Sequence, residues 1–353
     1  MAKHTMFLAK ENKNDEFYTC YDEIEKELNH YAKYFKNKVI YCNCDDHAGI
    51  GLGTPKSNFL KYFADNFEAF GIKRVIATHY ERDGASTMYI LDKDNTGDGI
   101  ICSEDIQAIP LKSNVDFRSD ECVKLLKTAD LVVTNPPFSL FREYVAQLME
   151  YKKKFIIIGN INAITYREVF PLIKENKMWV GYGFNVAMIF KTLYKNTSES
   201  NRKNVRSHGY DPDDNYITTP AVCWFTNLPT TKRTEFLETG KKYYGYEHMY
   251  PKYENYDAIN INKTDDIPMD YDGAMGVPIT FLNKHNPDQF EIIGLGISNS
   301  GLEIGVKPYK PEHKLYRKTI QKRGAVDGDL YMMVDNIVTV PYARILIKKK
   351  KGN

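Results

Sequence analysis

Residues 128–141 read TADLVVTNPPFSLF, a strand pattern that runs directly into a rigid polar loop. Leu131–Thr134 are apolar or β-branched, which is typical of a strand buried in a sheet. The strand pattern ends abruptly in an asparagine, two prolines and a phenylalanine. Because proline has a fixed φ and no N–H to donate, residues 135–138 are expected to form a stiff loop at the end of this strand.

Strand and helix patterns alternate on both sides of this stretch. KVIYCNCDD (38–46), KRVIATHY (73–80) and KFIIIGNINAITY (154–166) have strand character. SNFLKYFADNFEAFG (57–71) has helical periodicity, with Ser57 as its N-cap and Gly71 as its stop. The alternation predicts βαβ units in an α/β fold, a doubly wound, mostly parallel sheet with helices on both faces. In such a sheet ligands bind beyond the carboxyl ends of the strands, where NCDD and NPPF fall.

The pattern changes in the second half of the chain. FNVAMIFK (184–191) and AVCWFTNL (221–228) are predicted to be two adjacent strands, with the polar loop 192–216 inserted between them. Beyond residue 230 the chain is rich in Tyr, with short strands separated by Gly and Pro. We therefore expect two domains, residues 1–229 and an α+β domain of residues 230–353. The terminal KKKK (348–351) is expected to be a disordered basic tail.

Composition indicates a soluble globular protein, with 42% hydrophobic and 27% charged residues. The apolar runs are strand-sized and the first residues are polar, so neither a membrane span nor a signal peptide is expected. The six Cys are scattered without a disulfide or metal pattern, which favours a reduced, cytoplasmic setting and no metal. Residues 181–353 carry 24 Lys and Arg against 20 Asp and Glu, so a polyanion should bind mainly there.

The NPPF loop suits one kind of chemistry. The amide oxygen of Asn135 and the carbonyl oxygen of Pro136 are two acceptors that can converge on an NH₂ group attached to a flat conjugated ring. Such contacts draw the nitrogen toward tetrahedral geometry and free its lone pair, while Phe138 stacks on the ring. The electrophile must lie in line on the far side, as a methyl sulphonium group would. The structural alternative is a Pro-Pro turn with a core phenylalanine.

The motifs together resemble one enzyme family. The NPPF loop after a strand is similar to the catalytic loop of S-adenosylmethionine-dependent amino-methyltransferases, in the form found in adenine-N6 enzymes. Across most of the chain the sequence resembles the EcoRI-type adenine-specific DNA methyltransferases. The matching segments are DEFYT (15–19), KVIYCNCDD (38–46), SNFLKYFADNF (57–67), VDFRS (115–119), VVTNPPFSLFR (132–142), IIGNIN (157–162) and YPKYENYDAININKTDDIP (250–268). The resemblance implies a Rossmann-like methyltransferase fold, S-adenosylmethionine as cofactor, and a C-terminal target-recognition domain.

The resemblance also implies roles for individual residues. The catalytic loop would comprise Asn135, Pro136, Pro137 and Phe138. The cofactor would contact Phe17, Tyr18 and Thr19 at its methionine part, Asn43, Cys44 and Asp45 at the exit of the first strand, and Asp116 and Phe117 at its adenine. The chain departs from the family in lacking a glycine-rich loop at that exit. It also lacks the usual ribose-binding acid, for which Glu81 and Asp83 are the alternatives, and HAGIGLGTPK (47–56) is interpreted as an inserted surface loop.

Double-stranded DNA is the partner that this resemblance implies. An adenine inside a duplex cannot reach the loop, so it must be flipped out of the stack. The segment KPYKPEHKLYRKTIQKR (307–323) holds seven Lys and Arg against one Glu, and is interpreted as a phosphate-contacting strip. The candidate DNA-binding residues are Arg202, Lys203 and Arg206 in the polar loop and Lys310, Lys314, Arg317 and Lys318 in the strip. No protein partner is implied, so we expect a monomer.

The leading interpretation is a sequence-specific DNA adenine-N6 methyltransferase, from a restriction-modification system or an orphan on a mobile element. A protein-glutamine N5-methyltransferase is an alternative, because a glutamine amide is also an NH₂ group on a conjugated carbon. A non-catalytic DNA-binding relative is another, because the glycine-rich loop is absent. The basic C-terminal half argues against a protein-glutamine methyltransferase. The intact NPPF loop argues against a non-catalytic DNA-binding relative. An adenine within GAATTC is the first target to test.

Overall fold

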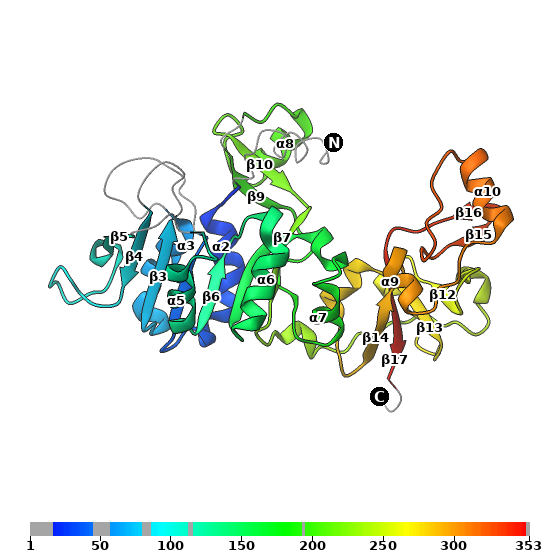
Figure 1. Ribbon diagram of the computed structural model, residues 1–353, viewed down its shortest axis with the longest axis horizontal. Coiled ribbons are helices and arrows are strands. Elements are labelled where there is room, and N and C mark those ends of the chain that lie inside the picture. Colours follow the sequence, from blue (N-terminus) through cyan, green and yellow to red (C-terminus); the bar gives the residue numbers. More distant parts are fainter. Residues whose placement is uncertain (1–16, 45–56, 80–85, 112–115, 193–194, 351–353) are drawn as a thin grey trace. The chain divides into compact units, whose positions relative to one another are not determined.

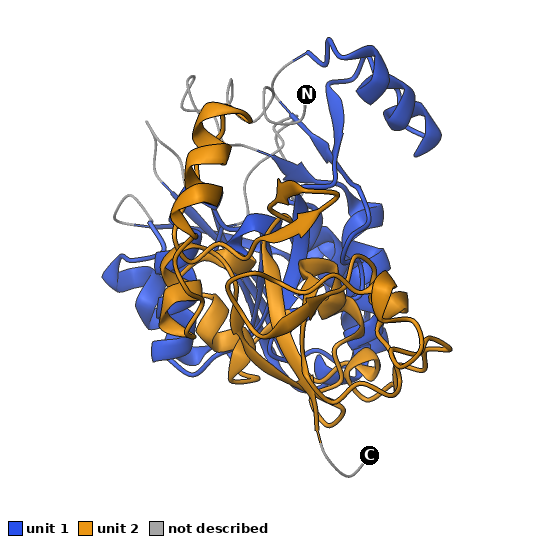
Figure 2. Ribbon diagram, turned by 90° about the vertical axis from the view of Figure 1, so that its right-hand side faces the viewer, with its two compact units in different colours: residues 1–163, 180–228 blue, residues 164–179, 229–353 orange. Residues whose placement is uncertain are grey.

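A computed structural model describes residues 17–44, 57–79, 86–111, 116–192 and 195–350. The chain forms two compact units (Figure 2). Unit 1 comprises residues 1–163 and 180–228, and unit 2 comprises residues 164–179 and 229–353. None of the helices in the described ranges is long and apolar enough to cross a membrane.

Unit 1 is built on a large mixed sheet. In spatial order its strands are β5 (Gln107–Pro110), β4 (Thr87–Leu91), β3 (Arg74–His79), β2 (Val39–Cys42), β6 (Leu131–Thr134), β7 (Lys154–Asn160), β11 (Val222–Thr226) and β8 (Trp179–Val180). The four central strands, β3, β2, β6 and β7, run parallel to one another. The flanking β4, β5 and β11 are antiparallel. Unit 1 therefore has the predicted α/β architecture, but its sheet is mixed rather than mostly parallel.

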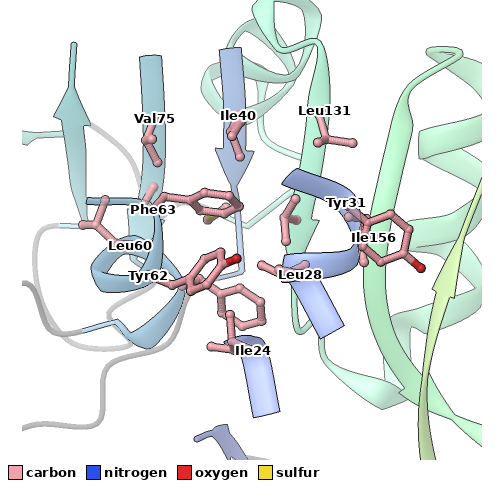
Figure 3. Close-up of a cluster of buried hydrophobic side chains, with 14 of the residues drawn as sticks. Ile24, Leu28, Tyr31, Ile40, Leu60, Tyr62, Phe63, Val75, Leu131 and Ile156 are labelled. Atoms are coloured by element: carbon pink, nitrogen blue, oxygen red, sulfur yellow. The ribbon is translucent and has the colours of Figure 1, made fainter. Parts of the chain in front are cut away.

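Helices cover both faces of this sheet, because its side chains alternate along each strand. Ile40, Val75, Leu131 and Ile156 pack on one face against α2 (Tyr21–Leu28), a 3₁₀ turn (Asn29–Tyr34), α3 (Asn58–Asp65) and α4 (Phe67–Phe70) (Figure 3). The opposite face meets α5 (Asp120–Thr128) and α6 (Phe141–Glu150) (Figure 1). The doubly wound arrangement predicted from the alternation is present.

The boundaries of the helical segment after β2 follow from local chemistry. The Ser57 hydroxyl accepts hydrogen bonds from the backbone N–H groups of Phe59 and Leu60, at 3.1 and 3.2 Å, and so caps α3. Gly71 ends α4 in the left-handed conformation with φ of 60°. Both predicted ends of this segment are confirmed.

A second, antiparallel sheet of three strands belongs to unit 1. Its order is β1 (Tyr18–Thr19), β9 (Met188–Lys191) and β10 (Tyr216–Thr219). The segments 184–191 and 221–228 were predicted to be adjacent strands, and this prediction is wrong, because β9 lies in the small sheet and β11 in the large one. The polar segment between them is not simply a loop. It contains α8 (Glu199–Ser207), whose Val205 packs with Cys20 and Ile189.

Unit 2 contains two further sheets. The larger has the order β12 (Ala258–Asn260), β13 (Ala274–Pro278), β17 (Arg344–Lys349) and β14 (Phe290–Leu295), and the smaller pairs β15 (Met332–Val334) with β16 (Ile337–Thr339). Its α-helices are α7 (Phe170–Lys174), α9 (Ser298–Glu303) and α10 (Pro311–Thr319). The expectation of a disordered KKKK tail is wrong for Lys348 and Lys349, which lie in β17 and pair with β14.

Short 3₁₀ turns connect several of these elements. In the first 165 residues these turns are Ser103–Asp105, Phe138–Leu140 and Ile161–Thr165. In unit 2 they are Thr231–Arg233, Glu247–Met249, Thr264–Asp266 and Ile279–Lys284. The turn at Phe138–Leu140 leads from the NPPF loop into α6.

The start of α6 is held by a close contact with β7. A Cβ atom at Gly159 would lie 2.4 Å from the Phe141 ring, which is itself buried. We therefore expect Gly159→Ala to lower the free energy of unfolding by about 1–3 kcal/mol through overpacking. Urea unfolding followed by tryptophan fluorescence measures this, because Trp224 is buried on the neighbouring strand.

Gly240→Ala is the matched control, since no atom lies within 4 Å of a Cβ atom built at that position. Its unfolding midpoint should equal that of the wild type. An unchanged midpoint in Gly159→Ala would contradict the proposed restraint on α6.

Candidate active site

The NPPF loop lies at the carboxyl end of the central strand β6. The neighbouring strand β2 ends at the same edge of the sheet, because β2 and β6 are parallel. The backbone N–H of Cys44, just after β2, donates to the Thr134 hydroxyl at the end of β6, at 3.1 Å. Pro136 is buried, whereas Asn135 and Phe138 are half-buried. The structure therefore brings the NPPF loop and the residues that follow β2 together.

The side-chain amide of Asn135 is bonded at one end only. Its NH₂ group donates to the Phe17 carbonyl oxygen at 2.8 Å and to the Thr19 hydroxyl at 3.3 Å. Its oxygen is shielded from solvent and accepts no hydrogen bond from any residue that the structure describes. A buried acceptor without a partner costs about 1–3 kcal/mol, so this oxygen is a candidate ligand-binding atom.

Aromatic rings pack around the loop. Phe138 stacks on Phe17, with ring centroids 6.1 Å apart and an interplanar angle of 21°. Phe17 in turn meets the edge of Phe190 on β9, at 6.0 Å. The DEFYT segment was expected at the cofactor, and its described residues Phe17 and Thr19 touch the NPPF loop directly. Tyr18 pairs with Lys191 in the small sheet.

The exit of β2 contains a second incompletely bonded amide. Asn43 is buried, and its side-chain oxygen accepts a short hydrogen bond from the Tyr144 hydroxyl. Its backbone oxygen accepts from Thr78 at 3.3 Å. The NH₂ group of Asn43 has no hydrogen-bond partner within the described ranges. Asp45, predicted to act beside Asn43 and Cys44, lies outside the described residues.

Asp116 and Phe117 lie before α5. The Arg118 guanidinium donates to the Asp116 carboxylate at 2.7 and 2.8 Å, and this contact holds the pKa of Asp116 below its ordinary value. Phe117 is buried and meets the Tyr144 ring edge-on at 5.1 Å. Tyr144 therefore touches both Asn43 and Phe117, and joins two predicted cofactor segments. Burial raises the pKa of Tyr144 far above its ordinary value, so its hydroxyl stays protonated.

Sequence reasoning missed three residues that organise this region. Tyr144 is nine positions beyond Asn135 on α6, and no motif marks it. Asn58 donates its side-chain NH₂ to the Thr19 carbonyl at 2.8 Å. Arg118 was visible in the VDFRS motif, where its charge next to Asp116 was the available signal. The ribose-binding alternatives Glu81 and Asp83 and the glycine-containing segment 47–56 lie outside the described residues.

The predicted DNA-binding cations differ in their contacts. Three form ion pairs at 2.6–2.7 Å, namely Arg202 with Asp213, Lys310 with Glu254 and Lys314 with Asp327. Arg206 lies 3.6 Å from Glu199, and Arg317 donates to the Gly324 carbonyl. Lys203 and Lys318 are exposed, and no ion pair involves them among the residues that the structure describes.

An α/β sheet with an Asn-Pro-Pro-Phe loop at the carboxyl end of a central strand defines the class, a methyltransferase that acts on amino groups. The model of the family described as adenine-specific methyltransferase EcoRI matches residues 5–350, and the chain belongs to this family. It is thus a site-specific, adenine-specific DNA methyltransferase, and the family likeness inferred from the sequence is confirmed. An enzyme of this family requires a methyl donor.

Two relatives illustrate the match. The chain is 47% identical over 323 residues to the type II methyltransferase M.EcoRI of Escherichia coli, covering 85% of this chain and 93% of that protein. It is 39% identical over 299 residues to the type II methyltransferase M.MpnI of Mycoplasma pneumoniae, covering 82% and 85%. No solved structure matches significantly. The match does not favour a protein-glutamine methyltransferase or a non-catalytic relative.

The Asp116–Arg118 pair predicts a pH-dependent effect. Because the pKa of Asp116 is lowered in the folded protein, the pair stabilises the fold above the ordinary value of 3.8 and loses this effect as pH falls further. Arg118→Gln should therefore have a lower unfolding midpoint than the wild type at neutral pH, and the difference should shrink below about pH 4. Thermal unfolding at a series of pH values measures it. A difference that grows toward acid would contradict the assignment.

Proposed function

We propose that the protein transfers a methyl group from S-adenosylmethionine to the N6 nitrogen of an adenine flipped out of duplex DNA. The observation that supports this most directly is the unpaired, buried oxygen of Asn135. An adenine amino group has two N–H donors, and one of them would satisfy this oxygen. The Pro136 carbonyl would accept the other. The same loop would then hold the nitrogen lone pair toward the methyl donor.

The Asn135 oxygen is shielded from solvent in this conformation, so an entering adenine must displace the groups that cover it. Phe138 is the ring assigned to stack on the base. It already has one face against Phe17, and this contact would hold the ring in place as the base arrives. Flipping costs a few kcal/mol of unstacking, and such aromatic contacts recover part of it.

The residues at the exits of β2 and before α5 fit S-adenosylmethionine. The unpaired NH₂ group of Asn43 is a buried donor that suits an oxygen of the cofactor. The Asp116 carboxylate remains ionised and suits amino or hydroxyl donors. Cys44, Asp45 and Phe117 complete the proposed set, and Phe17, Tyr18 and Thr19 lie in the segment assigned to the methionine part. When bound, the cofactor supplies a methyl group activated by a sulphonium.

Double-stranded DNA would be bound by cations of both units. Lys203 and Arg206 on α8 belong to unit 1, and Lys318 on α10 belongs to unit 2. Lys203 and Lys318 are the strongest candidates for phosphate contact, because neither is neutralised by an acid among the described residues. Arg202, Lys310 and Lys314 would bind phosphate only with loss of their present ion pairs. Arg317 is the remaining candidate.

The catalytic role of Asn135 predicts a loss of turnover without loss of DNA affinity. Asn135→Ala should lower kcat at least about 100-fold, because it removes an acceptor used in the transition state. Its affinity for duplex DNA should stay close to that of the wild type. Labelled S-adenosylmethionine, duplex DNA and digestion to nucleosides measure N6-methyladenine, and a gel-shift assay measures binding.

Asn66→Ala is the control for this experiment. Asn66 is also half-buried and its side chain donates to a backbone carbonyl, that of Tyr62, at 2.9 Å. This variant should keep wild-type methylation. Label found in protein instead of N6-methyladenine, or full activity in Asn135→Ala, would be incompatible with the proposal.

The two lysines on the exposed side of α10 should differ in their effect on DNA binding. Lys318→Ala removes a cation without an ion pair and should reduce the slope of log affinity against log salt by about 1. Lys314→Ala also removes a positive charge, but it frees Asp327 from its pair at 2.7 Å. In the wild type, the DNA phosphates near Lys314 would face a nearly neutral Lys314–Asp327 pair. Lys314→Ala should therefore change the salt slope less than Lys318→Ala does. Equal slopes for Lys318→Ala and wild type would exclude Lys318.

A further inference from the structure

The two residues of β1 are held from several sides. Tyr18 and Thr19 pair with Lys191 and Phe190 of β9. The Thr19 carbonyl accepts from Asn58 at 2.8 Å, and Asn58 is the first residue of the Ser57-capped helix α3. Thr19 is 5% exposed. A side chain placed this firmly can serve as a reference point for another group.

The group that Thr19 touches is the amide of Asn135. The Asn135 NH₂ lies between two acceptors, the Phe17 carbonyl at 2.8 Å and the Thr19 hydroxyl at 3.3 Å. The two ends of a carboxamide have similar size and opposite hydrogen-bonding character. A half-turn of the amide would exchange the unpaired oxygen for an NH₂ group, which cannot accept a hydrogen bond from an adenine amino group.

We infer that Thr19 is a positioning residue for methyl transfer, which together with the Phe17 carbonyl holds the Asn135 amide with its oxygen toward the substrate. The inference rests on the proposed role of Asn135 as an acceptor for the adenine amino group. The Phe17 carbonyl can only accept a hydrogen bond, so it determines that the NH₂ end of the Asn135 amide points toward it. The Thr19 hydroxyl narrows the range of its rotation.

This role differs from a direct contact with the cofactor, which the resemblance assigned to Thr19. A cofactor contact acts on the affinity for S-adenosylmethionine. A positioning contact acts on kcat when both substrates are saturating, because it changes how often Asn135 is correctly oriented. The two roles are therefore separable in one set of measurements.

Thr19→Val is the decisive variant, because it keeps the shape of the side chain and removes the acceptor. Since the Phe17 carbonyl remains, we expect kcat to fall roughly 10-fold, well short of the loss in Asn135→Ala. Thr19→Ser retains a hydroxyl and should recover most of the wild-type kcat. The dissociation constant for S-adenosylmethionine, measured by calorimetry, should change less than about 2-fold in both variants.

Thr226→Val is the matched control for burial. Thr226 is also buried in unit 1, where its hydroxyl donates to the Phe155 carbonyl at 2.7 Å and accepts from Leu228 at 3.0 Å. It should lower the thermal unfolding midpoint while leaving kcat unchanged. A fall of kcat in Thr19→Val without a comparable fall in Thr226→Val then excludes a general loss of packing.

Four results would overturn the inference. An unchanged kcat in Thr19→Val with weakened cofactor affinity would make Thr19 a cofactor contact. Failure of Thr19→Ser to recover kcat would show that the hydroxyl is not the operative group. If Asn135→Ala is inactive while Thr19→Val is fully active, only the positioning role fails. If Asn135→Ala remains active, the proposed function itself fails.

Discussion

The amide of Asn135 is the constraint on which the proposed site depends. Its donor end is satisfied inside the protein, whereas its acceptor end is shielded from solvent and has no partner among the described residues. An isolated domain gains nothing from a buried acceptor without a partner, because desolvation of that atom opposes folding. The arrangement is reasonable when the missing donor arrives with the substrate. The position of the loop at the carboxyl end of β6 places this atom where parallel sheets bind their ligands.

The restraint on that amide extends well beyond the loop. Phe17 and Thr19 are held by β9, and the turn before β9 is anchored by a buried carboxylate on α2. Glu27 accepts from the backbone N–H groups of Tyr182 and Gly183, each at 2.7 Å. A Cβ atom at Gly181 would lie 2.2 Å from the same carboxylate, so the turn can approach only without a side chain there. The small sheet is thus fixed to the core that surrounds β6.

Local chemistry is what the sequence allowed us to predict, and long-range pairing is what it did not. Ser57 and Gly71 mark the ends of their helical segment because capping involves neighbours only a few residues away. The NPPF loop was identified because strand, prolines and ring are contiguous. By contrast, β9 and β11 have the same apolar pattern, which cannot tell which sheet a strand joins. The contact between Thr19 and Asn135 spans 116 residues, and neither residue type signals the other. Ion pairing of Lys314 but not Lys318 depends likewise on a residue in another segment, Asp327.

One continuous segment connects the loop assigned to the adenine with the residues assigned to the methyl donor. Asn135 leaves β6, and α6 begins six residues later at Phe141, whose ring packs against Gly159. One turn further, Tyr144 bonds the Asn43 amide and packs on Phe117. A shift of α6 along the sheet would therefore move the NPPF loop, to which we assign the adenine, and disturb both segments assigned to the cofactor together. Because methyl transfer requires the nitrogen, the methyl group and the sulphonium to be in line, a single rigid element that sets both sides reduces the number of independent errors in their alignment. On the proposed mechanism, the tight packing of α6 on β7 would serve alignment as well as stability.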